Sequence, residues 1–140
     1  MELEKSAGTI LFRKGKEVLY YLLLHYQVGH WDFPKGNIEK GEQITETARR
    51  ETKEETGIGD IEFIQGFKEE IEYFYQREGK RIYKTVIFFL SRTKTKGVKI
   101  SFEHQGFEWL NYEKALKKLT HKNAKEILKK ANKVLLRIEI

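Results

Sequence analysis

Apolar and aromatic residues occur along the chain in short runs that alternate with polar, glycine-containing segments. Runs bounded by turn residues are typical of β-strands, whereas apolar positions spaced three and four residues apart indicate amphipathic helices. One polar segment ends at Gly57, and glycine readily adopts the left-handed conformation in which helices commonly end. The expected elements are strands at residues 7–12, 17–25, 61–76, 82–91 and 107–110, a loop at 28–41, and helices at about 45–56, 112–119 and 121–136.

This order of strands, helix, strands and two helices predicts one mixed α/β domain covering residues 1–140. A chain of 140 residues with 39% hydrophobic residues can bury a core but is short for two domains. No stretch reaches the length of a membrane span, and the first five residues lack the basic-then-apolar order of a signal peptide. We therefore expect a soluble, cytoplasmic protein that does not associate with a membrane.

The charged composition points to an anionic partner. The net charge of +6 suits a polyphosphate or a nucleic acid, because a basic surface attracts anions. Much of the excess lies near the C-terminus, at Lys114, Lys117, Lys118, Lys122, Lys125, Lys129, Lys130 and Lys133. Apolar residues between these lysines follow helical spacing, which favours a solvated helix face over a nucleic-acid surface. The absence of cysteine excludes disulfides and Cys-ligated zinc, so any metal must be held by oxygen or imidazole.

Three carboxylates in the expected helix at 45–56 suggest a metal site. Glu51, Glu54 and Glu55 are three and four residues apart, so a helix places them toward one side. Like charges at this spacing cost about a few tenths of a kcal/mol per pair, unless a cation offsets them. Hard divalent ions such as Mg²⁺ or Mn²⁺ prefer oxygen ligands. On composition alone, the alternative is a surface helix whose glutamates are balanced by neighbouring basic residues.

The spacing of these residues is more specific than their composition. Gly36, Glu42, Arg50, Glu51, Glu54, Glu55 and Gly57 follow the pattern Gly, five residues, Glu, seven residues, Arg-Glu, two residues, Glu-Glu, one residue, Gly. Seven such positions match by composition at a rate on the order of 10⁻⁷ per window. Residues 36–58 therefore resemble the Nudix box, and the chain is similar to the Nudix hydrolase family. Thr52 departs from the general box, in which an aliphatic residue is usual at this position.

The resemblance implies an α/β/α sandwich with a mixed β-sheet and the metal-dependent hydrolysis of a phosphoanhydride. It implies that Glu54 and Glu55 ligate the metal, joined by Glu51 and by the backbone carbonyl of Lys35. Glu103 is a candidate for an additional ligand. Metal ions held there would polarise the phosphoanhydride and acidify a bound water.

The resemblance also assigns supporting roles within the box. Arg50 would orient a catalytic glutamate through a fork-shaped ion pair, and Glu42 would support the metal ligands or the loop. Gly36 permits a tight loop before the helix, and Gly57 ends the helix. Two residues, Glu51 and Glu103, are candidates for the general base that deprotonates the water.

Segments outside the box resemble the asymmetrical diadenosine tetraphosphate hydrolases. They are residues 30–36 (His-Trp-Asp-Phe-Pro-Lys-Gly), 66–68, 84–87 and 103–105, and Thr52 also fits this subfamily better than the general box. The match extends over about residues 7–112. It implies cleavage of diadenosine tetraphosphate to ATP and AMP by attack of water on a phosphorus atom.

Four residues would bind this substrate according to the resemblance. His30, Lys35 and Lys84 would contact the phosphate chain, and Tyr73 would stack on an adenine. Three of these residues, all but Lys35, also have a second interpretation. His30 could form a structural hydrogen bond beside Trp31, Tyr73 could be an ordinary outward-facing strand residue, and the ammonium group of Lys84 could pair with a carboxylate.

Other activities stay open at this stage. Another Nudix substrate, such as a 5′-triphosphorylated RNA end, a modified nucleoside triphosphate or an inositol pyrophosphate, would use the same box. A non-catalytic module that senses nucleotides is the alternative from another class. The complete set of Glu51, Glu54 and Glu55 argues against such a module, because a sensor does not need a full catalytic metal site.

Overall fold

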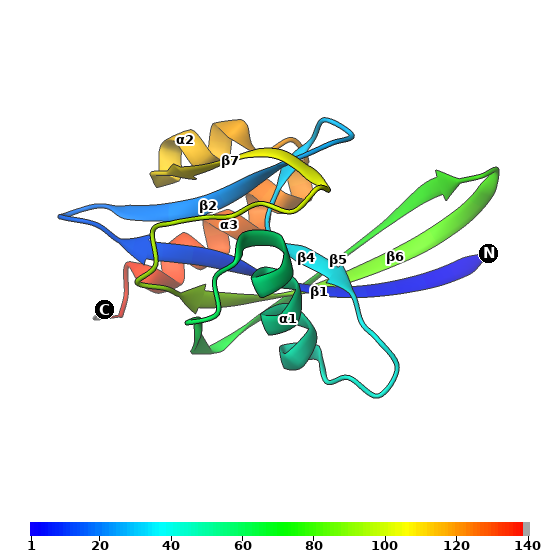
Figure 1. Ribbon diagram of the computed structural model, residues 1–140, viewed down its shortest axis with the longest axis horizontal. Coiled ribbons are helices and arrows are strands. Elements are labelled where there is room, and N and C mark those ends of the chain that lie inside the picture. Colours follow the sequence, from blue (N-terminus) through cyan, green and yellow to red (C-terminus); the bar gives the residue numbers. More distant parts are fainter. Residues whose placement is uncertain (139–140) are drawn as a thin grey trace.

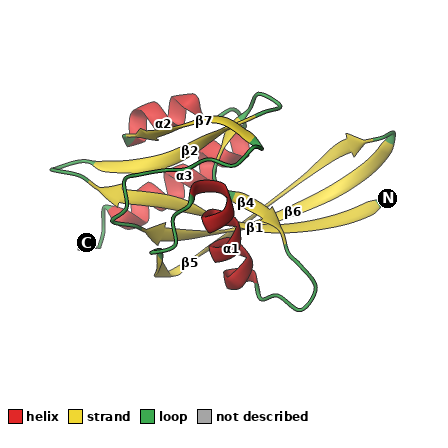
Figure 2. Ribbon diagram, viewed as in Figure 1, coloured by secondary structure: helices red, strands yellow, loops and turns green. Residues whose placement is uncertain are grey.

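The computed structural model describes residues 1–138, which form a mixed seven-stranded sheet with helices on both faces (Figures 1 and 2). The strands are β1 (Glu2–Lys14), β2 (Leu19–Tyr26), β3 (Trp31–Asp32), β4 (Lys35–Asn37), β5 (Glu62–Arg77), β6 (Lys80–Arg92) and β7 (His104–Leu110). The helices are α1 (Ile44–Thr56), α2 (Tyr112–Lys118) and α3 (Lys122–Leu135). This architecture confirms the predicted α/β/α sandwich with a mixed sheet.

Strand β1 organises the sheet because it pairs with three other strands. It pairs in parallel with β6 over residues 2–12. It pairs antiparallel with β4 at residues 6–8 and with β2 at residues 12–14. Strands β3 and β7 then extend the sheet from β2, and β5 extends it from β6. Strand β1 thus links the short strand β4 to both halves of the sheet.

The expected strands are present, but two features differ from the sequence-based prediction. The segment 28–41, expected to be a loop, contains the short strands β3 and β4. Strands of two or three residues are too short to show periodicity, and they form because β2 and β1 offer free edges for pairing. Strand β1 also begins earlier than residue 7, because β6 runs alongside its first residues.

The two faces of β6 contribute to two different cores. Val86, Phe88 and Leu90 pack in a cluster that includes the buried residues of α2 and α3. Ile87 and Phe89 belong to a second cluster beneath α1. Successive strand residues point to opposite faces, so burial on both faces explains the continuous apolar run at 86–90.

Helices α2 and α3 cover one face of the sheet and keep their lysines on the outside. The buried residues of α3 are Ala124, Ile127, Leu128, Ala131 and Leu135. Most of the lysines of α3 are exposed, as the predicted amphipathic pattern requires. Within residues 1–138, no helix is long and apolar enough to cross a membrane.

Helix α1 covers the other face with small and polar residues. Its buried residues are Thr47, Ala48, Thr52, Glu55 and Thr56. The hydroxyl of Thr52 donates to the carbonyl oxygen of Ala48 (2.7 Å), and that of Thr56 donates to the carbonyl oxygen of Thr52 (2.6 Å). Because these hydroxyls are satisfied within the helix, Thr52 can be fully buried where an aliphatic residue is usual.

Both ends of α1 are fixed by local interactions. The Glu46 carboxylate accepts a hydrogen bond from the backbone N–H of Gln43 (3.2 Å) just before the first turn. Gly57 ends the helix at φ 77°, and its N–H donates to the carbonyl oxygen of Lys53 (2.9 Å). The predicted helix at 45–56 and its glycine stop are confirmed.

The long β5–β6 hairpin projects from the body of the molecule together with the first residues of β1 (Figure 1). Glu78 and Gly79 turn the hairpin with positive φ angles of 52° and 78°. We call the projecting residues 2–5, 72–77 and 80–85 the wing. Its three strands bring residues that are distant in sequence into adjacent rows.

Replacing Gly57 with alanine should destabilise the protein by about 1 kcal/mol, because a β-carbon is strained in the left-handed conformation. The free energy of unfolding in urea measures the effect. Gly97→Ala is the matched control, since Gly97 has no positive φ and open space around its Cα. Equal stabilities of the two variants would contradict the assigned role of Gly57.

Candidate active site

The three carboxylates of α1 lie in different environments. The side chain of Glu55 is 4% exposed, that of Glu51 14% and that of Glu54 57%. The three carboxylates of one helix therefore range from buried to mostly exposed. Only Glu54 is mostly exposed, whereas the other two are largely enclosed by the protein.

Glu55 is held by a strand and a histidine. Its Oε1 accepts a hydrogen bond from the backbone N–H of Lys35 on β4 (2.9 Å). Its Oε2 lies 3.3 Å from Nε2 of the buried His104, whose Nδ1 lies 3.0 Å from the Ser101 hydroxyl. Burial raises the pKa of Glu55, and His104 and the Lys35 N–H act against this shift. These contacts fix one carboxylate oxygen against β4 and the other against β7.

Glu51 lies directly against the glycine that opens the box. A β-carbon at Gly36 would overlap the carboxyl group of Glu51, so any other residue there would displace this carboxyl group from its observed position. Burial, with the nearby charges of Glu55, Glu54 and Glu103, raises the pKa of Glu51 to about 7, although Arg50 opposes the shift. Gly36 thus has a packing role that its turn-like sequence context did not predict.

Arg50 forms its fork-shaped ion pair with Glu42. Its Nε donates to Glu42 Oε2 (2.7 Å) and its Nη2 to Glu42 Oε1 (3.1 Å). Its Nη1 lies 3.2 Å from both oxygens of Glu54 and 3.4 Å from Glu51 Oε1. The hydrogen bonds from Arg50 and the Thr47 hydroxyl lower the pKa of Glu42 to about 2. The fork therefore anchors the loop to α1, while one further nitrogen faces the expected metal ligands.

The side chains around Glu51, Glu54 and Glu55 offer oxygen donors to a divalent cation. Among residues 1–138, no three His, Asp or Glu side chains converge as a preformed metal-binding group. The available donors are nevertheless oxygen atoms, which hard cations prefer. The carboxylates near the helix repel one another: Glu51, Glu54, Glu55 and Glu103. A divalent ion bound among them would offset this repulsion. The residues therefore fit Mg²⁺ or Mn²⁺.

A large cavity lies between the sheet and the start of α3, and no residue of α1 lines it. Its volume is about 1060 Å³, and all four predicted substrate-binding residues line it: His30, Lys35, Tyr73 and Lys84. Its other walls come from β5 and from the start of α3, including His121. Lys35 connects the two regions, because its side chain lines the cavity while its backbone N–H binds Glu55.

The cavity residue His30 belongs to an aromatic stack that the sequence did not reveal. The ring of Tyr26 stacks on His30 with centroids 4.7 Å apart, and Lys35 Nζ lies 5.6 Å from the centre of the Tyr26 ring. Burial lowers the pKa of His30, although Asp32 acts in the opposite direction. A lowered pKa favours the neutral imidazole, which can offer a hydrogen bond to a ligand.

Lys84 already has protein partners in this structure. Its Nζ donates to Glu4 Oε1 and to Asn37 Oδ1, both at 2.9 Å. Glu4 also accepts hydrogen bonds from the Tyr75 hydroxyl and from Arg77 Nη1, both at 2.7 Å. The sequence favoured a ligand as the partner of Lys84, whereas the structure pairs it with a carboxylate at the edge of the cavity.

Four residues around the site were not identified from the sequence: Glu4, Tyr26, Asn37 and His104. Of these, His104 lies in the segment 103–105, whose resemblance drew attention to its neighbour Glu103. Glu103 is exposed in the turn before β7. No sequence signal links Glu4 to Lys84, because the two residues are 80 positions apart.

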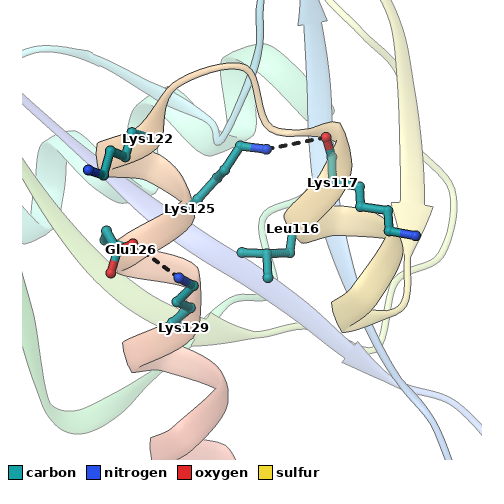
Figure 3. Close-up of a pocket in the computed structure, with 6 residues that line it drawn as sticks. All are labelled: Leu116, Lys117, Lys122, Lys125, Glu126 and Lys129. Carbon is teal, nitrogen blue, oxygen red and sulfur yellow. Dashed lines mark hydrogen bonds and ion pairs between the residues drawn. The ribbon is translucent and has the colours of Figure 1, made fainter.

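A second, smaller groove lies between α2 and α3 and has a volume of about 400 Å³. Figure 3 shows that its lysines do not converge: Lys117 and Lys122 point to opposite sides. Lys125 Nζ donates to the Lys117 carbonyl oxygen (3.4 Å), and Lys129 pairs with Glu126 (3.1 Å). This arrangement matches the solvated helix face predicted from the sequence.

Comparison with known proteins identifies close relatives. The model of the NUDIX domain family matches residues 2–131. The asymmetrical bis(5′-nucleosyl)-tetraphosphatase of Mus musculus is 36% identical over 143 aligned positions, which cover 94% of this chain and 95% of that protein. The enzyme of the same name from Caenorhabditis elegans is 33% identical and covers 90% of this chain and 92% of that protein.

The fold agrees with solved structures. The binary complex of a C. elegans Ap4A hydrolase superimposes with a TM-score of 0.86 at 31% identity and covers 96% of this chain and 99% of that one. The E. coli dihydroneopterin triphosphate pyrophosphohydrolase has a TM-score of 0.73 at 19% identity over 93% of this chain and 97% of that one, which shows a shared fold.

The Glu4 network should make stability depend on pH in the acid range. Burial acts to raise the pKa of Glu4, but hydrogen bonds from Tyr75, Lys84 and Arg77 lower it from 4.5 to about 2. The stabilisation is therefore fully present above pH 4.5 and is lost as the pH falls through about 2. The stability difference between wild type and Glu4→Gln should be on the order of 1 kcal/mol at neutral pH, allowing for solvent screening.

Chemical denaturation at several pH values between 2 and 7 measures this difference. Glu2→Gln is the control, because Glu2 lies two residues away on the same strand and its side chain is 50% exposed. If the stability difference between wild type and Glu4→Gln is the same at every pH from 2 to 7, the assigned role of the Glu4 carboxylate is wrong.

Proposed function

The chain belongs to the Nudix hydrolase family, and from that premise we propose that it hydrolyses diadenosine tetraphosphate to ATP and AMP. Water adds to one phosphorus of the tetraphosphate, and the phosphoanhydride P–O bond at that phosphorus breaks. The two nucleotides leave with net release of a proton. The observation that carries the proposal is the dual role of Lys35. Its side chain lines the 1060 Å³ cavity, and its N–H fixes the carboxylate of Glu55.

The chemistry of the cavity supports a nucleotide with several phosphates. Lys35 and Lys84 supply positive charge for phosphate oxygens, and the His30 imidazole supplies a hydrogen bond. Tyr73 is partly buried on the cavity wall and offers a ring on which an adenine stacks. The names of the mouse and C. elegans relatives support the same substrate, because both are tetraphosphatases of asymmetrical type.

The carboxylates of α1 would hold the metal. Glu54, Glu55, Glu51 and the carbonyl of Lys35 are the proposed ligands, and a divalent ion bound there would polarise the phosphoanhydride and acidify a water molecule. The protein itself fixes these groups in advance. Lys35 orients Glu55, and Arg50 lies against Glu54 while its fork to Glu42 holds the loop.

We assign proton acceptance to Glu51 and not to Glu103. The side chain of Glu51 is 14% exposed and lies between Gly36 and Arg50, so the protein encloses most of it. Glu103 lies exposed in a turn, where water competes for its carboxylate. A fixed base is more effective than a mobile one, because proton transfer needs the acceptor within hydrogen-bond distance of the water.

Purified protein with Mg²⁺ should convert diadenosine tetraphosphate to ATP and AMP in equal amounts, as measured by ion-exchange chromatography. Glu54→Gln and Glu55→Gln should each lose at least about 10²-fold in kcat, because each removes a proposed metal ligand. Glu62→Gln on the exposed part of β5 is the control and should behave like wild type.

The products decide between the alternatives. Two molecules of ADP would show symmetrical cleavage and contradict the proposal. Survival of the tetraphosphate, with cleavage of 5′-triphosphorylated RNA instead, would keep the family chemistry and reject the substrate. No cleavage of either compound with Mg²⁺ or Mn²⁺ would favour a non-catalytic nucleotide-binding module.

Glu51→Gln should lower kcat by about 10²- to 10⁴-fold, the usual contribution of a general base. Glu103→Gln should lower it by less than about tenfold, because an exposed residue is easily replaced by water. Steady-state kinetics at saturating Mg²⁺ compare the two variants. The reverse order of losses would assign the base to Glu103.

A further inference from the structure

Lys84 occupies a row of residues that crosses all three strands of the wing. Glu4 on β1 pairs with Lys84 on β6, and Lys84 pairs with Tyr73 on β5. Directly paired residues point to the same face of a sheet. The row therefore places a carboxylate, an ammonium group and the proposed adenine-stacking ring side by side, and the last two line the cavity.

The ammonium group of Lys84 is almost completely enclosed. The residue is 8% exposed and lies between the buried strand residues Ile82 and Val86. An ammonium group has three N–H donors, and two of them are used by Glu4 and Asn37. One donor is left for a ligand in the cavity that Lys84 lines.

Asn37 links this ammonium group to the carboxylate helix. Its Oδ1 accepts hydrogen bonds from Lys84 and from the Ser6 hydroxyl (2.8 Å). Its backbone oxygen accepts a hydrogen bond from Arg50 Nη2 (3.0 Å), and Arg50 contacts Glu54. A continuous chain of hydrogen bonds thus runs from the wing through β4 to α1.

We propose that Glu4 and Asn37 are positioning residues that fix the Lys84 ammonium group for a substrate phosphate and set its place relative to the metal-binding helix. The proposal rests on the proposed function of the cavity and adds two residues that are not among the seven fixed positions of the Nudix box. Long lysine side chains have many rotamers, and the two acceptors restrict Lys84 to one of them. Glu4 also balances part of the positive charge shared by Lys84 and Lys35.

The proposal predicts a specific pattern among variants. Glu4→Gln and Asn37→Ala should each lower kcat/KM for diadenosine tetraphosphate by about 10- to 100-fold, because misplacement of a binding group by about 1 Å has effects of that size. Asn37→Asp should retain most activity, since an aspartate oxygen can still accept from Lys84. Glu2→Gln should match wild type, because Glu2 pairs with Arg77 and Lys80 but not with Lys84.

A double-mutant cycle separates positioning from general destabilisation. In a Lys84→Met background, Glu4→Gln and Asn37→Ala should cause no further loss of kcat/KM, because the group that they position is absent. Thermal melting of every variant identifies the temperature range in which all are folded. Losses that persist in the Lys84→Met background, or a Glu4→Gln variant that equals Glu2→Gln, would overturn the proposal.

Binding of inorganic tripolyphosphate, followed by calorimetry, gives a second readout that does not require catalysis. Glu4→Gln and Asn37→Ala should bind it about tenfold more weakly than wild type and Asn37→Asp. If the wild type binds tripolyphosphate but leaves diadenosine tetraphosphate intact, the proposed function fails and the binding data alone decide the role of Glu4 and Asn37. If wild type and both variants bind equally, or the wild type does not bind, the positioning proposal fails.

Discussion

The hydrogen bond from the Lys35 N–H to Glu55 is the contact on which the rest of the site depends. A buried carboxylate is costly unless donors surround it, and here β4 supplies one donor while His104 lies against the second oxygen. Strand β4 is held in place because it pairs with β1, and α1 is held because it packs on the same sheet. The backbone N–H of Lys35 therefore ties α1 to the short strand whose Lys35 side chain lines the cavity.

The wing adds residues from outside the Nudix box to this arrangement. The parallel pairing of β1 with β6 aligns Glu4 with Lys84, and the hairpin adds Tyr73 to the same row. The cavity is thus formed by the sheet itself, with α3 as the opposite wall. Binding groups mounted on paired strands are held more precisely than groups on loops.

The box divides its acidic residues between structural and chemical tasks. Glu42 is saturated by Arg50, Thr47 and a backbone N–H, which leaves it little capacity to bind a metal directly. Glu51 and Glu54 keep oxygen atoms near a single arginine nitrogen, and Glu55 is shared with β4. The regular spacing in sequence therefore does not imply equivalent roles.

The sequence by itself determined the helix at 45–56, its glycine end, the box spacing and the strands with clear periodicity, because these features rest on interactions between near neighbours. It also identified His30, Lys35, Tyr73 and Lys84, which the fold brings to one cavity. Only the tertiary structure decided the partners of these residues. The contact of Glu4 with Lys84, the clearance between Gly36 and Glu51, and the stack of Tyr26 on His30 arise from strand pairing and packing, which local sequence patterns do not encode.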